Sequence, residues 1–542
     1  MTASAATPSS APDSAVDVVI VGAGFAGLYM LHKTRRLGLS AVVFEAGDGV
    51  GGTWYWNRYP GARCDVESME YSYQFDDDLQ QEWHWSERFA PQPEILKYAN
   101  HVADRFDLRR DIRFSTRVMA AHFDESALRW TVRTDRGDAV TGRFVVMATG
   151  CLSSTNKPAF KGLDSFKGPT YHTGEWPHEP VDFTGQRVAV IGTGSSAVQS
   201  IPIIAQQASA LTVFQRTANF SIPARNAPLD PAYESRIKAD YRGFRARNSQ
   251  MLSGFGSNHP RSEISIFSVD EATRHRAFQE RWDRGGLGFQ GSFADLMIDM
   301  KANQIAADWV RARIREVVKD PATAELLSPR QVLGCKRMCV DTGYYATFNL
   351  PHVKLVDISQ GGIEAITPRG VMAGGQEYEV DRIVFATGFD AMTGTLMKID
   401  IRGRGGLSLR EAWSAGPRTY LGLNVAGFPN LFTISGPGSP SVLTNMIVSI
   451  EQHVNWIAEC MDWMRREGRR SIEALPQAQD AWVGHVNAVA DATLYPQCNS
   501  WYLGANVPGK TRVFMPLLGF PDYARRCSEV AAAGYEGFAL SA

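Results

Sequence analysis

The clearest pattern in the chain is an apolar, β-branched run that ends in closely spaced glycines and continues into helix-forming residues. It spans residues 16–31, where Val18 to Val21 precede Gly22, Gly24 and Gly27. In such a strand–turn–helix arrangement, the first glycine permits a tight turn and the second lets the backbone approach a pyrophosphate. The third lets the helix pack closely on the strand. The pattern predicts a Rossmann-like dinucleotide-binding unit.

The residue that follows the next predicted strand indicates which nucleotide this unit prefers. A second apolar strand, 40–44, ends at Glu45, 23 residues after Gly22. A carboxylate at this position can accept hydrogen bonds from the adenosine ribose hydroxyls.

A second copy of the pattern follows the strand 187–191. It reads Gly192-Thr193-Gly194-Ser195-Ser196-Ala197, with alanine in place of the third glycine. Here the next strand, 211–215, ends at Arg216, which can pair with a 2′-phosphate, whereas a carboxylate would repel it. A solvated charge at a strand end is the alternative. Together the two units predict two different nucleotides, most simply FAD and NADPH.

Two further segments, 144–150 and 383–388, are apolar strands ending in Ala-Thr-Gly. Each could be an ordinary strand end, but beside two glycine loops they resemble crossovers between domains. Residues 230–328 instead show helical spacing, for example over 302–319. We therefore predict an α/β fold with two Rossmann-like domains and a helical insertion in the second. The predicted parts are a disordered tail (1–15), an FAD-binding domain (16–149 and 388–542), an NADP-binding domain (150–229 and 329–387) and the helical insertion (230–328).

Charge and cysteine content narrow the function classes. The 56 basic and 57 acidic residues give a net charge of −1, which argues against nucleic acid or an anionic membrane as the main partner. The sequence contains no run of 18 uninterrupted apolar residues, so no membrane span is expected. The seven scattered cysteines contain no CxxC, so Cys335 and Cys339 are expected to be ordinary thiols in a reducing cytoplasm, with no metal site.

A twelve-residue stretch carries a resemblance to a known family. Residues 166–177 read FKGPTYHTGEWP, with Phe166, Gly168, His172, Trp176 and Pro177 at the defined positions of the FxGxxxHxxxWP fingerprint. This resembles the type I Baeyer–Villiger monooxygenases. A second signature runs from Gly51-Gly52-Thr53-Trp54 to Asp65. The resemblance extends from about residue 17 to the C-terminus and is nearest to the phenylacetone and steroid monooxygenase branch.

The resemblance implies a reaction. NADPH reduces FAD, O₂ forms a C4a-peroxyflavin, and this species inserts one oxygen atom beside a ketone carbonyl to give an ester or lactone. Arg337 matches the catalytic arginine of the family, and Asp65 matches the carboxylate that orients it. Lys336 and Arg216 match the pair that holds the 2′-phosphate, with Thr217 as an added hydroxyl. Ion pairing or loop capping are the structural alternatives for Arg337 and Asp65.

The remaining matched residues are expected to act through packing, domain contacts or substrate binding. His172 is expected to transmit signals between domains or to be a structural histidine, and Trp176 is expected to pack. Trp501 matches a tryptophan on a mobile loop that contacts NADP. The ketone pocket is expected to be lined by Leu152, Leu443, Thr444 and Met446, with aryl, cyclic or steroid-like ketones as substrates.

Three other functions remain open on the sequence alone. A flavin enzyme that oxygenates nitrogen or sulfur would not need Asp65 with Arg337. A disulfide reductase would need the missing CxxC, and a sensor that binds FAD and NADPH would not oxidise NADPH with substrate. The expected protein is a cytoplasmic monomer or weak oligomer whose partners are O₂ and a small ketone.

Overall fold

The computed structural model describes residues 14–505, 507, 509 and 515–542. The predicted tail lies outside the described residues as far as position 13, and its last two residues differ from the prediction. Ser14 and Ala15 begin the first strand, because they pair with Val140 and Thr141 of a neighbouring strand. Pairing to that longer neighbour extends the strand beyond the β-branched run that the sequence marks.

An eight-stranded sheet forms the first of two cores. Its order is β17-β4-β5-β6-β1-β2-β3, and β18 also pairs with β6. The inner strands β1, β2 and β6 run parallel, whereas β4 to β6 form an antiparallel meander. The strands are β1 (Ser14–Val21), β2 (Ala41–Phe44), β3 (Ile112–Arg113), β4 (Val118–Asp124), β5 (Arg129–Thr134), β6 (Ala139–Met147), β17 (Asp400–Arg402) and β18 (Leu431–Thr433). Strands that precede the second sheet in the sequence and strands that follow it therefore belong to one sheet.

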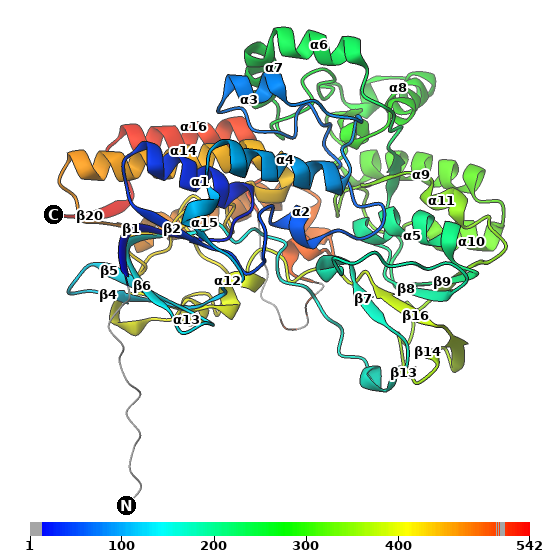
Figure 1. The fold of residues 1–542 in the computed structure, drawn as a ribbon. Helices are drawn as coiled ribbons and strands as arrows, with labels where there is room; N and C mark the ends of the chain where they lie inside the picture. The colour runs from blue at the N-terminus through cyan, green and yellow to red at the C-terminus, as the bar shows by residue number, and fades with distance from the viewer. Residues whose placement is uncertain (1–13, 506, 508, 510–514) are drawn as a thin grey trace, which may run out of the picture.

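A five-stranded parallel sheet forms the second core, in the order β12-β9-β8-β16-β7. Figure 1 shows it beside the first sheet. Its strands are β7 (Thr170–His172), β8 (Arg187–Ile191), β9 (Ala210–Gln215), β12 (Val353–Asp357) and β16 (Arg382–Phe385). Smaller pairings are made by β10 (Ser221–Pro223), β11 (Cys339–Asp341), β13 (Ala365–Thr367), β14 (Gly370–Ala373), β15 (Gln376–Glu379), β19 (Ser471–Ala474) and β20 (Phe538–Ser541).

Helices cover both sheets. On the first sheet, α1 packs against α14, and α16 packs on α14 in turn (Figure 1). On the second sheet, α5 follows the glycine loop. The helices are α1 (Phe25–Arg36), α2 (Thr53–Trp56), α3 (Asp77–Glu82), α4 (Gln92–Arg105), α5 (Ser195–Gln207), α6 (Pro231–Ala239), α7 (Tyr241–Ser249), α8 (Glu271–Arg284), α9 (Met300–Val317), α10 (Pro321–Leu327), α11 (Tyr344–Thr347), α12 (Gly394–Lys398), α13 (Leu409–Ala412), α14 (Met446–Arg466), α15 (Pro476–Asp491) and α16 (Phe520–Ala532). Within the described ranges, none is long and apolar enough to cross a bilayer.

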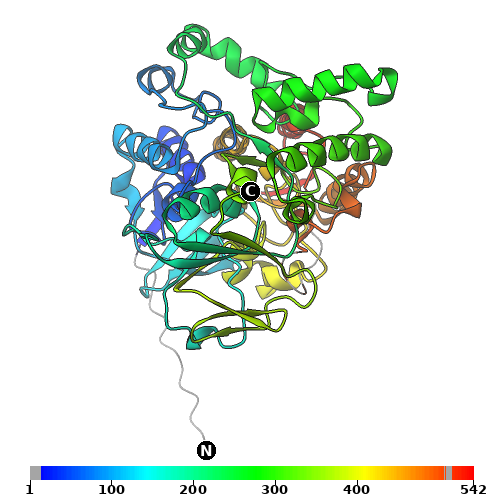
Figure 2. The same ribbon diagram turned by 90° about the vertical axis from the view of Figure 1, so that its right-hand side faces the viewer.

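The predicted helical segment 230–328 divides between the two cores. Ile237, Tyr241 and Phe244 of α6 and α7 are buried in the core of the first sheet. Phe278 of α8 and Val310 of α9 are buried in the core of the second. Figure 2 shows these helices, in green, over the top of the molecule. The segment is therefore a bridge across both units and not an insertion in the second alone.

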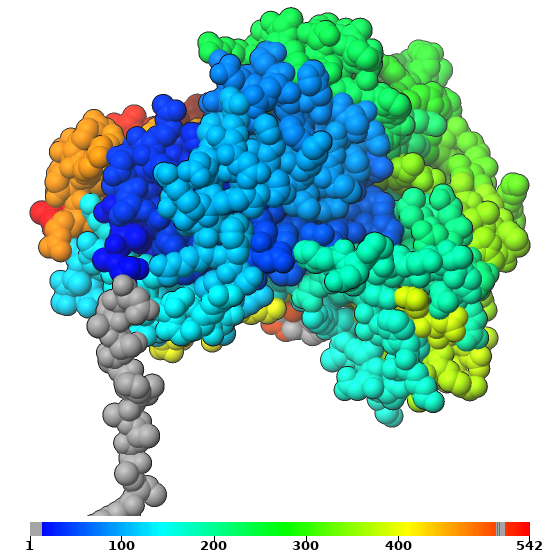
Figure 3. All heavy atoms as spheres, viewed as in Figure 1, coloured from blue at the N-terminus to red at the C-terminus, as the bar shows by residue number. Residues whose placement is uncertain are grey.

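The two units also touch directly below this bridge. The Tyr59 hydroxyl donates a 2.8 Å hydrogen bond to Oε1 of Gln199 in α5, and the Gln199 amide donates to the carbonyl oxygen of Arg63 at 3.1 Å. In Figure 3 the blue N-terminal residues and the teal residues of the second unit lie side by side on the visible face.

Candidate functional site

The two glycine loops have the same construction. Gly22 has φ +104° and Gly192 has φ +114°, which only glycine adopts without strain. A Cβ at Gly22 would lie 2.7 Å from the carbonyl oxygen of Ala148, and one at Gly192 would lie 2.4 Å from that of Ala386. The predicted Ala-Thr-Gly segments, which begin at these alanines, therefore lie directly against the glycine loops.

Both loops present an uncapped helix N-terminus. The N-caps of α1 and α5 are Gly24 and Gly194, neither helix has a side-chain cap, and neither first turn contains an acid. Free N–H groups and the helix dipole favour a phosphate at such an end. Open space surrounds the position of a Gly194 Cβ within 4 Å, and Ser195 beside it is exposed. The residues present thus fit a pyrophosphate at each loop.

Glu45 holds the first glycine loop in place. Its carboxylate accepts backbone hydrogen bonds from Ala23 at 2.7 Å and from Gly47 at 2.8 Å, and the residue is buried. Burial raises the pKa of the Glu45 carboxyl, against the lowering effect of these two bonds. Each carboxylate oxygen keeps a lone pair for a ribose hydroxyl.

The second signature packs onto the same loop. A Cβ at Gly52 would lie 2.8 Å from Cα of Gly24, and the Gly51 N–H donates to the carbonyl oxygen of Ala23 at 3.0 Å. Thr53, the first residue of α2, is exposed, whereas Trp54 is buried and donates from Nε1 to the Tyr71 hydroxyl at 3.1 Å. Gly27 lies in α1 where a Cβ would overlap the carbonyl oxygen of Gly22.

The second loop is built from small side chains. The Ser195 hydroxyl lies 3.4 Å from Sγ of Cys339, and the Ser196 hydroxyl lies 3.1 Å from that of Thr173, two elements away. Ala197, the departure from the three-glycine pattern, is completely buried in the second core. Its methyl group therefore packs without disturbing the loop.

Two cations lie close together beyond this loop. Arg216 and Thr217 are exposed at the end of β9. Burial lowers the pKa of the Lys336 ammonium, and the positive charge of Arg216 lowers it further, which places the two side chains within electrostatic reach. Among the described residues, no carboxylate forms an ion pair with either. A pair of unneutralised cations beside a nucleotide loop fits a 2′-phosphate.

Arg337 and Asp65 form a two-bond ion pair between loops that are 272 residues apart. Nε and Nη2 of Arg337 donate to the two carboxylate oxygens at 2.7 and 3.0 Å, and Nη1 donates to the carbonyl oxygen of Val442 at 2.7 Å. Burial is the largest single influence and lowers the pKa of the Arg337 guanidinium, but Asp65, Tyr502 and Cys64 together outweigh it and hold that pKa above its ordinary value. The guanidinium therefore stays charged, and three hydrogen bonds to Asp65 and Val442 hold it in place.

The fingerprint residues connect the second sheet to the segments between the units. Nδ1 of His172 accepts from the Gly174 N–H at 3.0 Å, so Nε2 carries the proton and donates to the Thr387 hydroxyl at 3.2 Å. That hydroxyl donates to the carbonyl oxygen of Asn156 at 2.7 Å. Burial lowers the pKa of the His172 imidazole, which keeps it neutral in this chain of bonds.

The other fingerprint residues pack. Trp176 is buried with its ring centroid 5.3 Å from that of Tyr171, and Pro177 follows it, half-buried. Phe166 packs on the far side of the second sheet, and a Cβ at Gly168 would lie 2.1 Å from the carbonyl oxygen of Asp381.

The expectation that Cys335 is an ordinary thiol is wrong. Cys335 forms a disulfide with Cys498, with 5.4 Å between the Cα atoms, whereas Cys339 is a free thiol. The partners are 163 residues apart, so no local spacing marks the pair. The bond also removes the cysteine-based argument for a reducing compartment. It ties the segment that carries Lys336 to the segment that carries Trp501.

Trp501 begins a short 3₁₀ turn, Trp501–Leu503, and is half-buried with its ring centroid 4.3 Å from that of Tyr502. Leu152, Leu443 and Met446 join it at the edge of one apolar cluster. This cluster brings together residues that the sequence places in four different segments.

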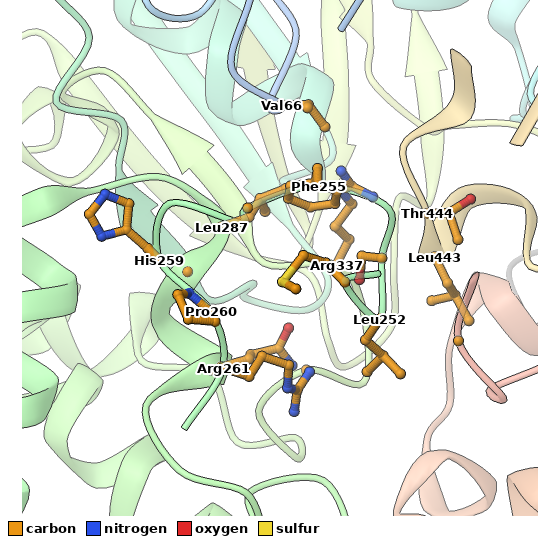
Figure 4. A pocket seen from close by; sticks show the side chains of 18 of the residues that line it. Val66, Leu252, Phe255, His259, Pro260, Arg261, Leu287, Arg337, Leu443 and Thr444 are labelled. Atoms are coloured by element: carbon orange, nitrogen blue, oxygen red, sulfur yellow. The ribbon is translucent and has the colours of Figure 1, made fainter. Parts of the chain in front are cut away.

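A cavity of about 550 Å³ lies next to this cluster. Asp65, Arg337, Leu443 and Thr444 line it, and Figure 4 shows Arg337, Leu443 and Thr444 around it. Leu152 and Met446, which pack on the apolar cluster, are not among its lining residues. The volume is within the usual range for a small-molecule site.

The sequence analysis missed much of the cavity wall. Residues 250–263 and 281–298 supply most of one side, and Tyr495 and Tyr502 contribute two phenol rings. Helical periodicity over 230–328 indicates which positions are buried, but it does not indicate that the loops between the helices face a ligand. Only the position of Tyr502 beside Trp501 could have suggested a role.

No group of three or more His, Cys, Asp or Glu side chains in the described ranges is placed to hold a metal ion.

Comparisons with known proteins connect this geometry to an enzyme family. Residues 19–253 match the family described as "Pyridine nucleotide-disulphide oxidoreductase". A "Baeyer-Villiger monooxygenase" of Pseudooceanicola batsensis is 44% identical over 96% of this chain and 95% of its own. "Phenazine N-monooxygenase PhzNO1" of Lysobacter antibioticus is 42% identical over 97% of both chains. The solved structure "Oxidized steroid monooxygenase bound to NADP" has a TM-score of 0.93 and 53% identity, over 97% of this chain and 99% of that one.

Proposed function

Because this chain belongs to the Baeyer–Villiger monooxygenase family, we propose that it converts a ketone, O₂, NADPH and a proton into an ester or lactone, water and NADP⁺. The observation that carries the proposal is the half-buried ion pair of Arg337 with Asp65 on the wall of a cavity of about 550 Å³. FAD, when bound, takes a hydride from NADPH, activates O₂ and supplies the inserted oxygen atom.

The first glycine loop is the FAD site. Its uncapped helix N-terminus at Gly24 receives the pyrophosphate, and the close packing of Gly52 on Gly24 leaves room only for backbone beside it. Glu45 orients the loop and keeps lone pairs for the ribose. Thr53, exposed at the start of α2, follows Gly52 directly and supplies a hydroxyl beside this loop.

The second glycine loop is the NADPH site. Arg216 and Lys336 would hold the 2′-phosphate, which would relieve the repulsion between these two cations. NADH lacks this phosphate, so the pair discriminates between the two coenzymes by about 2–3 kcal/mol. Thr217 adds a hydroxyl at the same strand end.

Arg337 stabilises negative charge on the oxygen atoms of the reaction. A guanidinium has five N–H donors, and three are used by Asp65 and Val442, so two remain for acceptors in the cavity. Asp65 holds the Arg337 guanidinium in one orientation and raises its pKa. The positive charge is therefore already in place, and no reorganisation is needed when negative charge develops on oxygen. One such preorganised donor lowers a barrier by about 3 kcal/mol.

His172 and Trp501 act on the fit between the two units. The bonds from His172 through Thr387 to Asn156 join the second sheet to both segments that link it to the first sheet. Trp501, tied to the Lys336 segment by the disulfide, covers the apolar cluster beside the cavity. A site closed in this way excludes water from the reacting oxygen.

The lining near Arg337 selects for apolar ketones. Leu443, Val442 and Phe255 are hydrophobic, and the volume accommodates aryl, cyclic or steroid-like ketones. Such walls separate substrates by only about 1–3 kcal/mol per methylene, so several ketones are accepted, with sulfides as further substrates.

N-oxygenation is the second candidate, because a relative of nearly equal identity is named for that reaction. The test offers phenylacetone, a phenazine and an aryl sulfide separately under ¹⁸O₂ with NADPH. We expect phenylacetone to give an ester with one ¹⁸O atom and one NADPH consumed per ester. Conversion of the phenazine without any ester would replace the proposed function by N-oxygenation.

A further inference from the structure

The cavity has a charged side as well as an apolar one. Arg261 and Arg281 line it on the side formed by the loops after α7 and at the end of α8. In the view of Figure 4, Arg261 lies across the cavity from the Arg337 guanidinium. The proposed ketone oxidation assigns no role to Arg261.

Four other carboxylates line the cavity, and three of them have partners, whereas Glu263, two residues after Arg261, is exposed and forms no ion pair among the described residues. Asp65 is paired with Arg337, and Glu67 is paired with Arg88 at 2.7 Å and with Arg284 at 3.2 Å. Glu70 accepts the Gly256 N–H at 2.8 Å, and burial raises the pKa of its carboxyl to about 7. Asp65, Glu67 and Glu70 are therefore not free to neutralise Arg261, and Glu263 forms no ion pair with it among the described residues.

Arg261 itself has no anionic partner. Within the described ranges, no carboxylate forms an ion pair with it. Its stem runs over Gly291, where a Cβ would lie 3.1 Å from Cγ of Arg261. Arg281 donates to the carbonyl oxygens of His259 at 3.0 Å and Pro260 at 2.7 Å, so it fixes the loop immediately before Arg261 and adds a second positive charge behind it.

The site of the ketone and the site of this charge are joined by one side chain. Tyr495 lines the cavity, and the positive charges of both Arg261 and Arg337 act on its hydroxyl. Because both arginines line one cavity of about 550 Å³, one small molecule can reach both. Leu252 and Ile298, which are 45% and 61% exposed, add apolar side chains to the lining of the same cavity.

We propose that Arg261, supported by Arg281, is an anion subsite, and that the preferred substrates are apolar ketones carrying a carboxylate at the end remote from the carbonyl. The carbonyl lies at Arg337, the hydrocarbon body lies against the Leu252 and Ile298 side chains, and the carboxylate pairs with Arg261. A guanidinium binds a carboxylate through two parallel hydrogen bonds, which a neutral ester cannot reproduce. The inference rests on the proposed ketone oxidation and adds a substrate class to it.

The test compares two ketones that differ only in charge, 4-(2-oxopropyl)benzoate and its methyl ester. The quantity measured is the ratio of their kcat/KM values, from ester formation. We expect the wild-type holoenzyme to prefer the carboxylate by about two- to fivefold, as for a partly exposed charge pair. We expect Arg261→Gln to bring the ratio close to one, Arg261→Lys to retain part of it, and Arg261→Glu to reverse it. Added salt should reduce the wild-type ratio.

The control is Arg276→Gln, which removes an exposed arginine of α8 that does not line the cavity. It should keep the wild-type ratio. If wild type and Arg261→Gln convert both ketones with the same ratio, the anion subsite is wrong and the ketone oxidation stands. If neither ketone nor phenylacetone gives an ester, the proposed function fails and the subsite fails with it.

Discussion

The disulfide between Cys335 and Cys498 leads to a prediction about stability that can be worked from the structure. It closes a loop of 163 residues. The entropy that a cross-link of this length removes from the unfolded chain corresponds to about 5 kcal/mol. Unfolding of 542 residues carries an entropy of about 1.1 kcal/mol per degree, so losing the bond should lower Tm by about 4 °C.

The assay follows Tm by flavin fluorescence or calorimetry on the holoenzyme. Cys498→Ser should lower Tm by this amount, and a thiol reductant should lower the wild-type Tm equally. The reductant should leave the Tm of Cys498→Ser unchanged, because no cross-link remains to break. Cys460→Ser, which changes a free buried thiol, serves as the control for reductant sensitivity: reductant should still lower its Tm. Equal Tm values for oxidised and reduced wild type would refute the reasoning.

Three further predictions follow from single groups. Arg216→Ala should raise KM for NADPH about 30-fold or more and leave KM for NADH within about twofold, and equal rises for both coenzymes would remove Arg216 from the phosphate site. Asp65→Asn should keep the cavity shape but lower kcat for ester formation about 10²-fold through loss of the carboxylate that orients Arg337, and an unchanged kcat would limit Asp65 to a structural role. Burial raises the pKa of Glu451 to about 7, and its Oε2 has no partner among the described residues. The native state therefore holds a proton that the unfolded chain releases, and stability falls as the pH rises from about 4.5 to 7. Glu451→Gln should remove this pH-dependent contribution to the free energy of unfolding, about 3 kcal/mol, so Tm should fall less between pH 5 and pH 8 than it does in wild type. A fall in Tm as steep as that of wild type would exclude Glu451 as its source.

Local patterns were sufficient to predict both glycine loops. The run from Val18 to Gly27 contains its own strand, turn and helix signals, so the prediction needed no tertiary information. The same holds for β8, which spans Arg187–Ile191 as predicted. Even the Ala-Thr-Gly segments were identifiable, although only the structure shows Ala148 and Ala386 against Gly22 and Gly192.

Long-range pairings were accessible only through the family resemblance or not at all. Asp65 and Arg337 are 272 residues apart, and no spacing rule joins them, so their pairing was inferred from matching motifs. The disulfide had no motif to match, because Cys335 pairs with a residue in a loop far along the chain. The cavity wall after α7 was missed for the same physical reason: loops between amphipathic helices carry no periodicity that marks a ligand-facing side.

The most direct test of the account separates the two halves of the reaction in one variant. Arg337→Ala removes the cation beside the cavity, and Arg330→Ala, at an exposed arginine outside the cavity lining, is the matched control. The measurement is the rate of flavin reduction by NADPH together with the ester formed from phenylacetone per NADPH consumed. We predict that Arg337→Ala is reduced at nearly the wild-type rate, forms at least about 10²-fold less ester, and releases the oxygen as H₂O₂. Ester formation by Arg337→Ala at the wild-type yield would contradict the account.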